Sequence, residues 1–385
     1  MDFITTIILV LVAALMGRFL SKKLKQPIIL GELIFGAIVG NIFILYYGET
    51  LELGDTVENL ANIGILFLLF SAGLSINLKE FKKIEKSSTV VAISGVILPF
   101  ALGYITAKFF GYTHATALFV GTALMATSIG VKAEVLLELR ILATRLGSLI
   151  IGAAVIDDII TMIVLTFLIS IIKTGDLLIW NISIFLILIL LYLSISILLT
   201  KEKVNYSLDN FLSKRKISRE NLFILGIVIA LIFSLIAETI GLSIIIGSFM
   251  AGIILGQLSF FRGFQDHVSM IGGGFFIPIF FVTVGMSFDF RAFLSIGLFA
   301  FVLLIVAILG KFIGCSIGAK LTGFDNRESI ATGVAMIPRA GIELILLKLG
   351  LEYEIINTEI ASAILIMVII TTLITPSALL RALRK

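Results

Sequence analysis

Long apolar stretches recur along the whole chain, separated only by short polar connections. Hydrocarbon about 30 Å thick needs about 20 apolar residues per helix, and in lipid only helices and closed barrels satisfy every backbone hydrogen bond. Charged residues make up 14% of the 385 positions, whereas soluble proteins carry roughly 25%. The sequence therefore predicts an all-α polytopic membrane protein with a single transmembrane domain over residues 1–385.

The pattern of apolar stretches and loops predicts thirteen membrane-spanning helices. The first stretch has no basic leader and no small-residue cleavage site, so we expect a span there rather than a signal peptide. The expected bounds are roughly 3–20, 27–46, 57–76, 89–107, 115–131, 145–171, 179–199, 220–237, 241–258, 268–286, 292–318, 328–348 and 356–380.

Basic residues gather in every second connection. The connections after the odd-numbered spans, together with the last residues of the chain, hold 23 of the 29 Lys and Arg residues. The positive-inside rule places these connections in the cytoplasm. We therefore expect a multi-pass protein of the cell membrane with its N-terminus outside and its C-terminus in the cytoplasm. The 23 residues are Arg18, Lys22, Lys23, Lys25, Lys79, Lys82, Lys83, Lys86, Lys132, Arg140, Arg145, Lys201, Lys203, Lys214, Arg215, Lys216, Arg219, Arg262, Lys320, Arg327, Arg381, Arg384 and Lys385.

The thirteen predicted spans divide into six, one and six. Spans 1–6 and 8–13 are offset by seven, an odd number, so matching spans cross the membrane in opposite directions. This arrangement predicts two inverted-topology six-helix repeats, which are common in secondary transporters. The first repeat would cover about 3–171, a linker span and loop about 179–219, and the second repeat about 220–380.

Two adjacent acids, Asp157 and Asp158, lie near the middle of the sixth span. Each charge at the bilayer centre costs about 2.5–3.5 kcal/mol on insertion scales, so such residues are functional candidates. Neighbouring carboxylates also repel each other and are hard to keep ionised without a cation. Lys311, inside the eleventh span, is the expected partner. The alternatives are an acid pair that only orients helices and a lysine that extends to the cytoplasmic face.

Two spans are predicted to be broken. Pro338 interrupts the run MIPRAGIE (336–343), because proline removes a backbone hydrogen bond. The run ATSIG (126–130) offers the hydroxyls of Thr127 and Ser128 beside a glycine. These two spans occupy matching positions in the two repeats, and paired interruptions indicate a transporter site. Freed carbonyls and hydroxyls are hard oxygen ligands suited to a small cation.

For other ionisable residues inside the spans, the sequence does not distinguish a functional role from a structural one. Arg339 and Glu343 are four residues apart, a spacing that allows an intrahelical ion pair of either functional or structural kind. Glu32 is expected to be a helix-end or packing residue. His114 and His267 are far apart in the chain, so no resident metal cluster and no cofactor are expected.

Several runs of the sequence resemble the conserved runs of the monovalent cation/proton antiporter-2 family and, within it, those of the NapA-type sodium/proton antiporters. The runs appear in the expected order over nearly the whole chain. Besides the aspartate doublet, they are QPIILGELIFGAIVG (26–40), LLFSAGLSINLKEF (68–81), FFIPIFFVTVGMSFD (275–289), ILGKFIG (308–314) and IPRAG (337–341).

The resemblance implies an architecture of thirteen helices with two crossing broken helices, assembled as a homodimer. A core bundle, about 89–171 and 292–380, would move against a dimerising panel, about 3–76 and 220–286.

The resemblance also implies roles for individual residues. Asp158 would be the principal carboxylate for sodium and protons, and Asp157 would pair with Lys311 when sodium is absent. Thr127 and Ser128 would be hydroxyl ligands or supports at the helix crossover.

The chain departs from the family pattern after the proline of the broken span. The family's Arg-Gly-Glu order is here Arg339-Ala340-Gly341, with Glu343 displaced by two positions. Potassium-efflux relatives often carry Gln-Asp at the doublet and a cytoplasmic nucleotide-binding domain. This chain has Asp-Asp and ends at Lys385, so the potassium-efflux reading is less favoured.

The combined reading is a secondary sodium/proton antiporter and not an enzyme. Sodium or lithium ions would compete with protons for the aspartate pair during alternating access, and the exchange would be electrogenic. The expected surroundings are a lipid bilayer and a second copy of the chain, with no nucleic acid. The alternatives are a potassium/proton antiporter or potassium-efflux pathway, a sodium-coupled organic solute symporter, and a membrane sensor that transports nothing.

Overall fold

A computed structural model shows how these stretches fold. It describes residues 3–47, 55–174, 179–201, 218–261, 263–286, 297–339 and 353–383, and short pieces at 204, 209–210, 291, 346–347 and 349–351. Within these residues the chain is helical and contains no strand. Nine of the described helices are long and apolar enough to cross a membrane. The predicted all-α membrane architecture is therefore confirmed, while the count of thirteen spans stays a prediction.

The first half of the chain begins with three long helices and continues to the peripheral helix α9. Most bounds lie close to the expected spans, and those of α9 coincide with the predicted 179–199. The helices are α1 (Phe3–Leu24), α2 (Ile28–Tyr47), α3 (Asp55–Leu74), α4 (Leu78–Lys83), α5 (Glu85–Phe109), α6 (His114–Ala123), α7 (Ile129–Glu138), α8 (Arg145–Thr174) and α9 (Ile179–Leu199).

The second half holds the remaining long helices and two short irregular turns. Gly272–Phe276 forms a π-helical turn between α13 and α14, so the three run as one continuous element. The elements are α11 (Arg219–Thr239), α12 (Ile244–Gly256), η1 (Ser259–Phe261), α13 (Phe264–Ile271), η2 (Gly272–Phe276), α14 (Ile277–Met286), α16 (Leu298–Leu321), α17 (Asn326–Ala335) and α19 (Thr358–Leu383).

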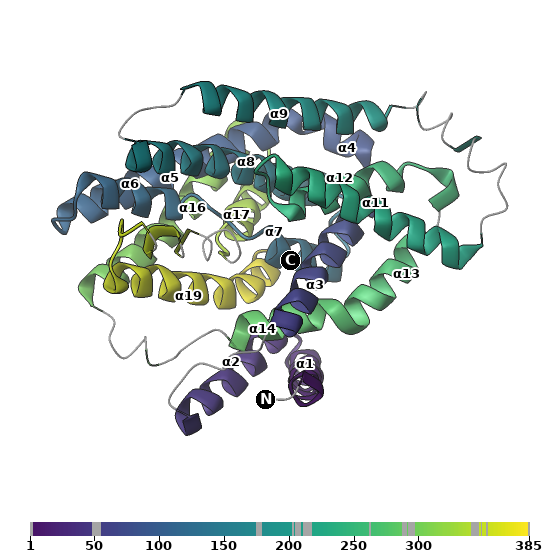
Figure 1. Cartoon of the computed structure of the whole chain (residues 1–385), viewed down its shortest axis with the longest axis horizontal. Coiled ribbons are helices and arrows are strands. Elements are labelled where there is room, and N and C mark those ends of the chain that lie inside the picture. The colour runs from purple at the N-terminus through teal and green to yellow at the C-terminus, as the bar shows by residue number, and fades with distance from the viewer. Residues whose placement is uncertain are drawn as a thin grey trace.

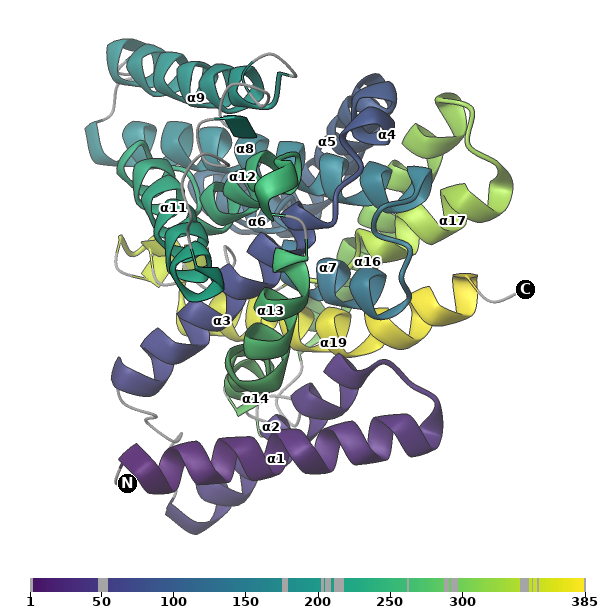
Figure 2. The same cartoon turned by 90° about the vertical axis from the view of Figure 1, so that its right-hand side faces the viewer.

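The helices pack in two sets of neighbours. In one set α1 lies against α2, α2 against α14, and α3 against α12. In the other, α5 packs along α16 and against α6 and α8, while α17 and α19 pack on α16. Two views at right angles place α1 and α2 at one extremity of the molecule and α9 at the opposite one (Figures 1 and 2).

Glycines set the closest helix approaches in both sets. A Cβ added to Gly31 of α2 would collide with the backbone of Gly17 in α1. In the second set, a Cβ on Gly314 of α16 would collide with the carbonyl oxygen of Ser94 in α5. Small residues at such crossings let backbones approach closely, which is how helices associate where lipid removes the hydrophobic driving force.

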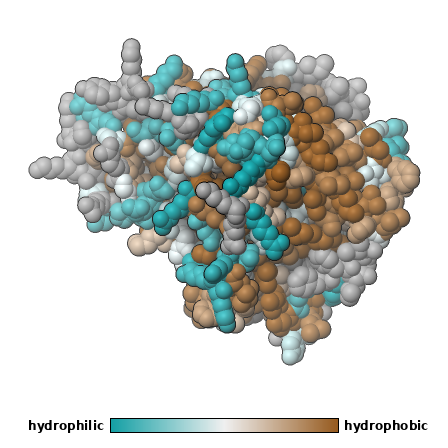
Figure 3. Space-filling model, turned by 180° about the vertical axis from the view of Figure 1, so that it is seen from behind, coloured by the Kyte–Doolittle hydropathy of each residue, from teal (hydrophilic) through white to brown (hydrophobic). Residues whose placement is uncertain are grey.

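The outer surface is apolar over wide areas. Figure 3 shows a broad hydrophobic expanse beside a narrower hydrophilic band on one face. Exposed apolar side chains on the long helices include Phe19, at 72%, Phe109, at 86%, and Leu321, at 76%. Exposed apolar patches of this extent on a monomer indicate contact with lipid or another chain.

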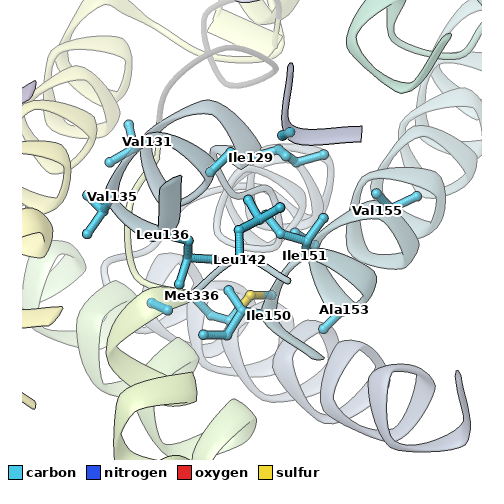
Figure 4. Packing of buried hydrophobic residues seen from close by; sticks show 14 of the residues in the cluster. Ile129, Val131, Val135, Leu136, Leu142, Ile150, Ile151, Ala153, Val155 and Met336 are labelled. Atoms are coloured by element: carbon cyan, nitrogen blue, oxygen red, sulfur yellow. The ribbon is translucent and has the colours of Figure 1, made fainter. Parts of the chain in front are cut away.

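A buried apolar cluster surrounds the place where α7 meets α8. Leu136 of α7 points toward Ile150 of α8 and Met336, whereas Val131 and Val135 project from the opposite side of α7 into the same cluster, which also includes Ile151 (Figure 4). All of these side chains are less than 2% exposed. The cluster holds α7 rigidly against the helix that carries the aspartate doublet.

Candidate ion site

Two interruptions in the helices lie next to each other, near the doublet. Helix α6 ends at Ala123 and α7 begins at Ile129, while α17 ends at Ala335. The Ser128 N–H donates to the Pro338 carbonyl oxygen at 2.8 Å, which joins the two breaks. The Ser128 side chain also accepts from Val131 N at 3.3 Å and so caps the start of α7. Serine is a preferred residue at this cap position because its oxygen satisfies a free backbone donor.

Arg339 caps the C-terminal end of α6. Its Nη1 donates to the carbonyls of Ala123 (3.0 Å) and Ala126 (2.8 Å), and its Nη2 to that of Leu124 (2.6 Å). The last carbonyls of a helix have no partner within the helix and carry its negative dipole end. The guanidinium therefore satisfies and neutralises the end of α6. The Thr372 hydroxyl in turn donates to the Arg339 carbonyl oxygen.

Asp157 lies beside the break between α6 and α7 and is fully buried. Lys311 Nζ is 2.7 Å from Asp157 Oδ1, which makes a buried ion pair with both side chains at 0% exposure. The Thr127 hydroxyl donates to Asp157 Oδ2 at 2.9 Å. Both carboxylate oxygens are thus engaged, one by an ammonium and one by a hydroxyl.

Asp158 is the next residue on α8 and is 2% exposed. Successive residues on a helix point about 100° apart, so the two acids face different surroundings. Thr161 lies one turn further along α8, and its buried Oγ1 has no hydrogen-bond partner among the described residues. This region therefore offers carboxylate and hydroxyl oxygens, which are the ligands that hard cations prefer.

Lys132 is also part of this cluster, which corrects the sequence analysis. The prediction ended the fifth span at 131 and placed Lys132 in a cytoplasmic connection. In the structure α7 continues to Glu138, and Lys132 is 0% exposed. Its Nζ donates to Thr127 Oγ1 at 2.9 Å and to Met336 Sδ at 3.3 Å. Length was the missed signal: a span needs about 20 residues, and 115–131 is shorter than that before allowing for the break.

The remaining candidates lie elsewhere or outside the described residues. Glu343 and its expected pairing with Arg339 lie outside the part of the chain that the structure describes. Glu32 is 1% exposed and accepts from Arg18 Nε at 2.6 Å, as expected for a packing residue. Near the same helix ends, Glu138 of α7 accepts from the Ile28 N–H at 2.7 Å.

Comparison with known proteins identifies the family. A family model described as "Sodium/hydrogen exchanger, transmembrane" matches residues 8–385. The chain belongs to this family. It is similar to the Na⁺/H⁺-K⁺ antiporter GerN of Bacillus cereus, with 33% identity over 98% of this chain and 95% of that protein. It is also similar to a Na⁺/H⁺ antiporter of Enterococcus hirae, with 34% identity over 98% of this chain and 97% of that protein.

The fold has a solved counterpart. The sodium proton antiporter MjNhaP1 of Methanocaldococcus jannaschii superposes with a TM-score of 0.69 at 16% identity, covering 99% of this chain and 96% of that one. Family membership also confirms the resemblance drawn from the motifs to cation/proton antiporters, and it makes this member of the sodium/hydrogen exchanger family a membrane-spanning protein.

Proposed function

We propose that this protein is a secondary sodium/proton antiporter, with lithium as an alternative cargo. The observation that carries the proposal is the buried Asp157–Lys311 pair near two adjacent interruptions in the helices. Relatives named as sodium/proton antiporters, similar along nearly their whole length, support it. Sodium and protons would compete for Asp157 and Asp158, with Thr127 and Ser128 as supporting oxygens.

The mechanism follows from the engaged oxygens of Asp157. In the sodium-free state Lys311 would neutralise this carboxylate through the ion pair at 2.7 Å. An arriving sodium ion would bind Asp158 and displace Lys311 from Asp157. Only a neutralised site crosses the membrane cheaply, because uncompensated charge at mid-membrane is costly. Two carboxylates and a displaced ammonium favour exchange of more than one proton per sodium, which is electrogenic.

The architecture proposed with this function has thirteen spans in two inverted repeats and works by alternating access. The core bundle, about 89–171 and 292–380, would move against the panel, about 3–76 and 220–286. The two sets of packed helices support this division. Helices α1 and α11 of the panel are the least buried of the nine candidate spans, which supports a homodimer through the panel. The N-terminus would lie outside the cell and the C-terminus in the cytoplasm.

The test is Asp158→Asn in proteoliposomes that carry an imposed pH gradient. The wild type should dissipate the gradient when sodium is added, and Asp158→Asn should not, because an amide binds neither ion as a carboxylate does. Asp266→Asn, the same change at an exposed acid on α13, is the matched control and should behave like the wild type. Sodium-dependent dissipation by Asp158→Asn would refute the assignment.

Potassium exchange is a second candidate because the relative GerN is named a Na⁺/H⁺-K⁺ antiporter. The same liposomes challenged with lithium, sodium and potassium separate the two candidates. Gradient dissipation by potassium at concentrations comparable to sodium would favour the second.

A further inference from the structure

A second buried lysine, Lys132, lies within the ion site that the doublet and Lys311 define. Its ammonium is fully buried and reaches Thr127 Oγ1 and Met336 Sδ. Among the described residues, no carboxylate makes a direct ion pair with it. A hydroxyl and a thioether are weak compensation for a buried charge. A residue held at such a cost is more readily explained by the ion site than by packing.

Two hydrogen bonds link Lys132 to Asp157 through Thr127, and the donor and acceptor in each of them can be assigned. A hydroxyl has one proton to donate, and Thr127 gives it to Asp157 Oδ2. Thr127 Oγ1 must therefore accept from Lys132, which occupies one of its lone pairs. Asp157 consequently stands between two ammonium groups, one in direct contact and one reached through Thr127.

The position of Lys132 makes it a rival of the transported cation. A sodium ion that used Thr127 Oγ1 as a ligand would lie close to the Lys132 ammonium, which donates to the same oxygen at 2.9 Å. Electrostatic repulsion between like charges is strong where burial excludes water. A movement of α7 that took Lys132 out of the site would have to unpack Val131, Val135 and Leu136 from the apolar cluster (Figure 4).

We propose that Lys132 is a positioning residue that weakens sodium binding. Its tethered ammonium orients the Thr127 hydroxyl toward Asp157 and opposes the entry of a second cation. A weakened site releases sodium readily and so favours turnover over tight binding. The inference rests on the proposed function, since it gives Lys132 a role in the same exchange.

The test compares Lys132→Gln with Lys320→Gln in proteoliposomes at a single near-neutral pH. Both changes remove one positive charge, but Lys320 is exposed at the end of α16. Lys132→Gln should lower the KM for sodium at least tenfold and lower Vmax, because release slows. Lys320→Gln should keep the wild-type KM, and Lys132→Arg should restore a KM near that of the wild type.

Sodium-dependent thermal stabilisation in detergent gives a readout independent of transport. Lys132→Gln should reach half of its maximal shift at a sodium concentration at least tenfold lower than the wild type. An unchanged or higher KM overturns the inference, as does loss of folding in both Lys132→Gln and Lys132→Met, which would assign Lys132 to packing. If instead the wild type shows no sodium-dependent proton exchange, the proposed function itself fails.

Discussion

At the scale of single residues, the Asp157 carboxylate is already engaged at both oxygens, by Lys311 and by Thr127. A cation that uses this carboxylate must share its oxygens with these donors or replace one of them. Asp158, the next residue on α8, carries the second carboxylate of the doublet and is 2% exposed. Under the proposed function, Lys311 would neutralise Asp157 when sodium is absent, and Asp158 would bind the transported cation.

Removal of Lys311 alone should destabilise the protein. Lys311→Gln leaves Asp157 buried without its counter-ion, and breaking a buried pair costs about 3–5 kcal/mol. Lys311→Gln combined with Asp157→Asn should recover much of this loss, because both charges leave together. A double-mutant cycle of thermal unfolding in detergent measures the coupling, expected at about 0.5–3 kcal/mol for contacting residues. Strict additivity would show that the two side chains do not form the pair in the membrane protein.

Proton competition should make sodium binding depend on pH. Protons and sodium use the same carboxylate oxygens, so sodium-dependent thermal stabilisation should need more sodium as the pH falls. The two acids should titrate as a coupled pair rather than as independent groups. An apparent sodium affinity that is constant from alkaline to acidic pH would exclude direct competition.

At the scale of secondary-structure elements, the interruption between α6 and α7 exposes helix ends inside the protein. Ser128 caps the start of α7, and Arg339 satisfies the end of α6. One of these caps is local in sequence, while the other comes from a residue more than 200 positions away. The two interrupted elements therefore stabilise each other.

Arg339→Gln should be strongly destabilising. The change leaves the carbonyls of Ala123, Leu124 and Ala126 buried without their charged donor, and each unsatisfied group costs about 1–3 kcal/mol. Arg327 provides the control, because it donates to carbonyls at the end of α19 on the exposed surface. Arg327→Gln should cost less than about 1 kcal/mol, as is usual for exposed interactions. Equal losses of thermal stability in the two variants would contradict the capping role of Arg339.

At the scale of the whole molecule, few polar contacts join the two sets of helices near the start of α2. The Ser377 hydroxyl of α19 donates to Gln26 Oε1 at 2.9 Å, and Glu138 of α7 accepts from the Ile28 N–H. If the core moves against the panel, these contacts must break in each transport cycle. Both of them lie at the end of α2 that begins at Ile28.

Linking the two sets of helices covalently should stop transport. In a Cys315→Ser background, Gln26→Cys and Ser377→Cys would be joined by a short thiol-reactive cross-linker. Transport should fall at least tenfold after cross-linking. The control pair is Ser71→Cys with Ser269→Cys, whose hydroxyls are 3.0 Å apart on α3 and α13 within one set. Cross-linking this pair should leave transport unchanged. Loss of transport in both, or in neither, would contradict the proposed division.

The sequence alone predicts most of the helices of this protein, because lipid permits few kinds of backbone structure. The apolar stretches predicted the helices closely, and the bounds of α9 agree to the residue. The doublet, Lys311 and the two interruptions stood out because charge and irregular backbone are costly in hydrocarbon. Those features are local, so the chain displays them without its fold. The count of thirteen spans stays a prediction, since several connections lie outside the described residues.

Only the tertiary structure decided which of these groups meet. Lys132 looked like one more basic loop residue, and its burial depends on α7 packing against α8 and on Met336, 204 positions away. The spacing of Arg339 and Glu343 allows a pair within one helix, which lies outside the described residues; what the spacing could not show is that Arg339 also reaches carbonyls of a different element. Sequence spacing specifies neighbours along one helix, whereas contacts between helices depend on how their faces pack. The second lysine of the ion site was therefore hidden until the fold placed it there.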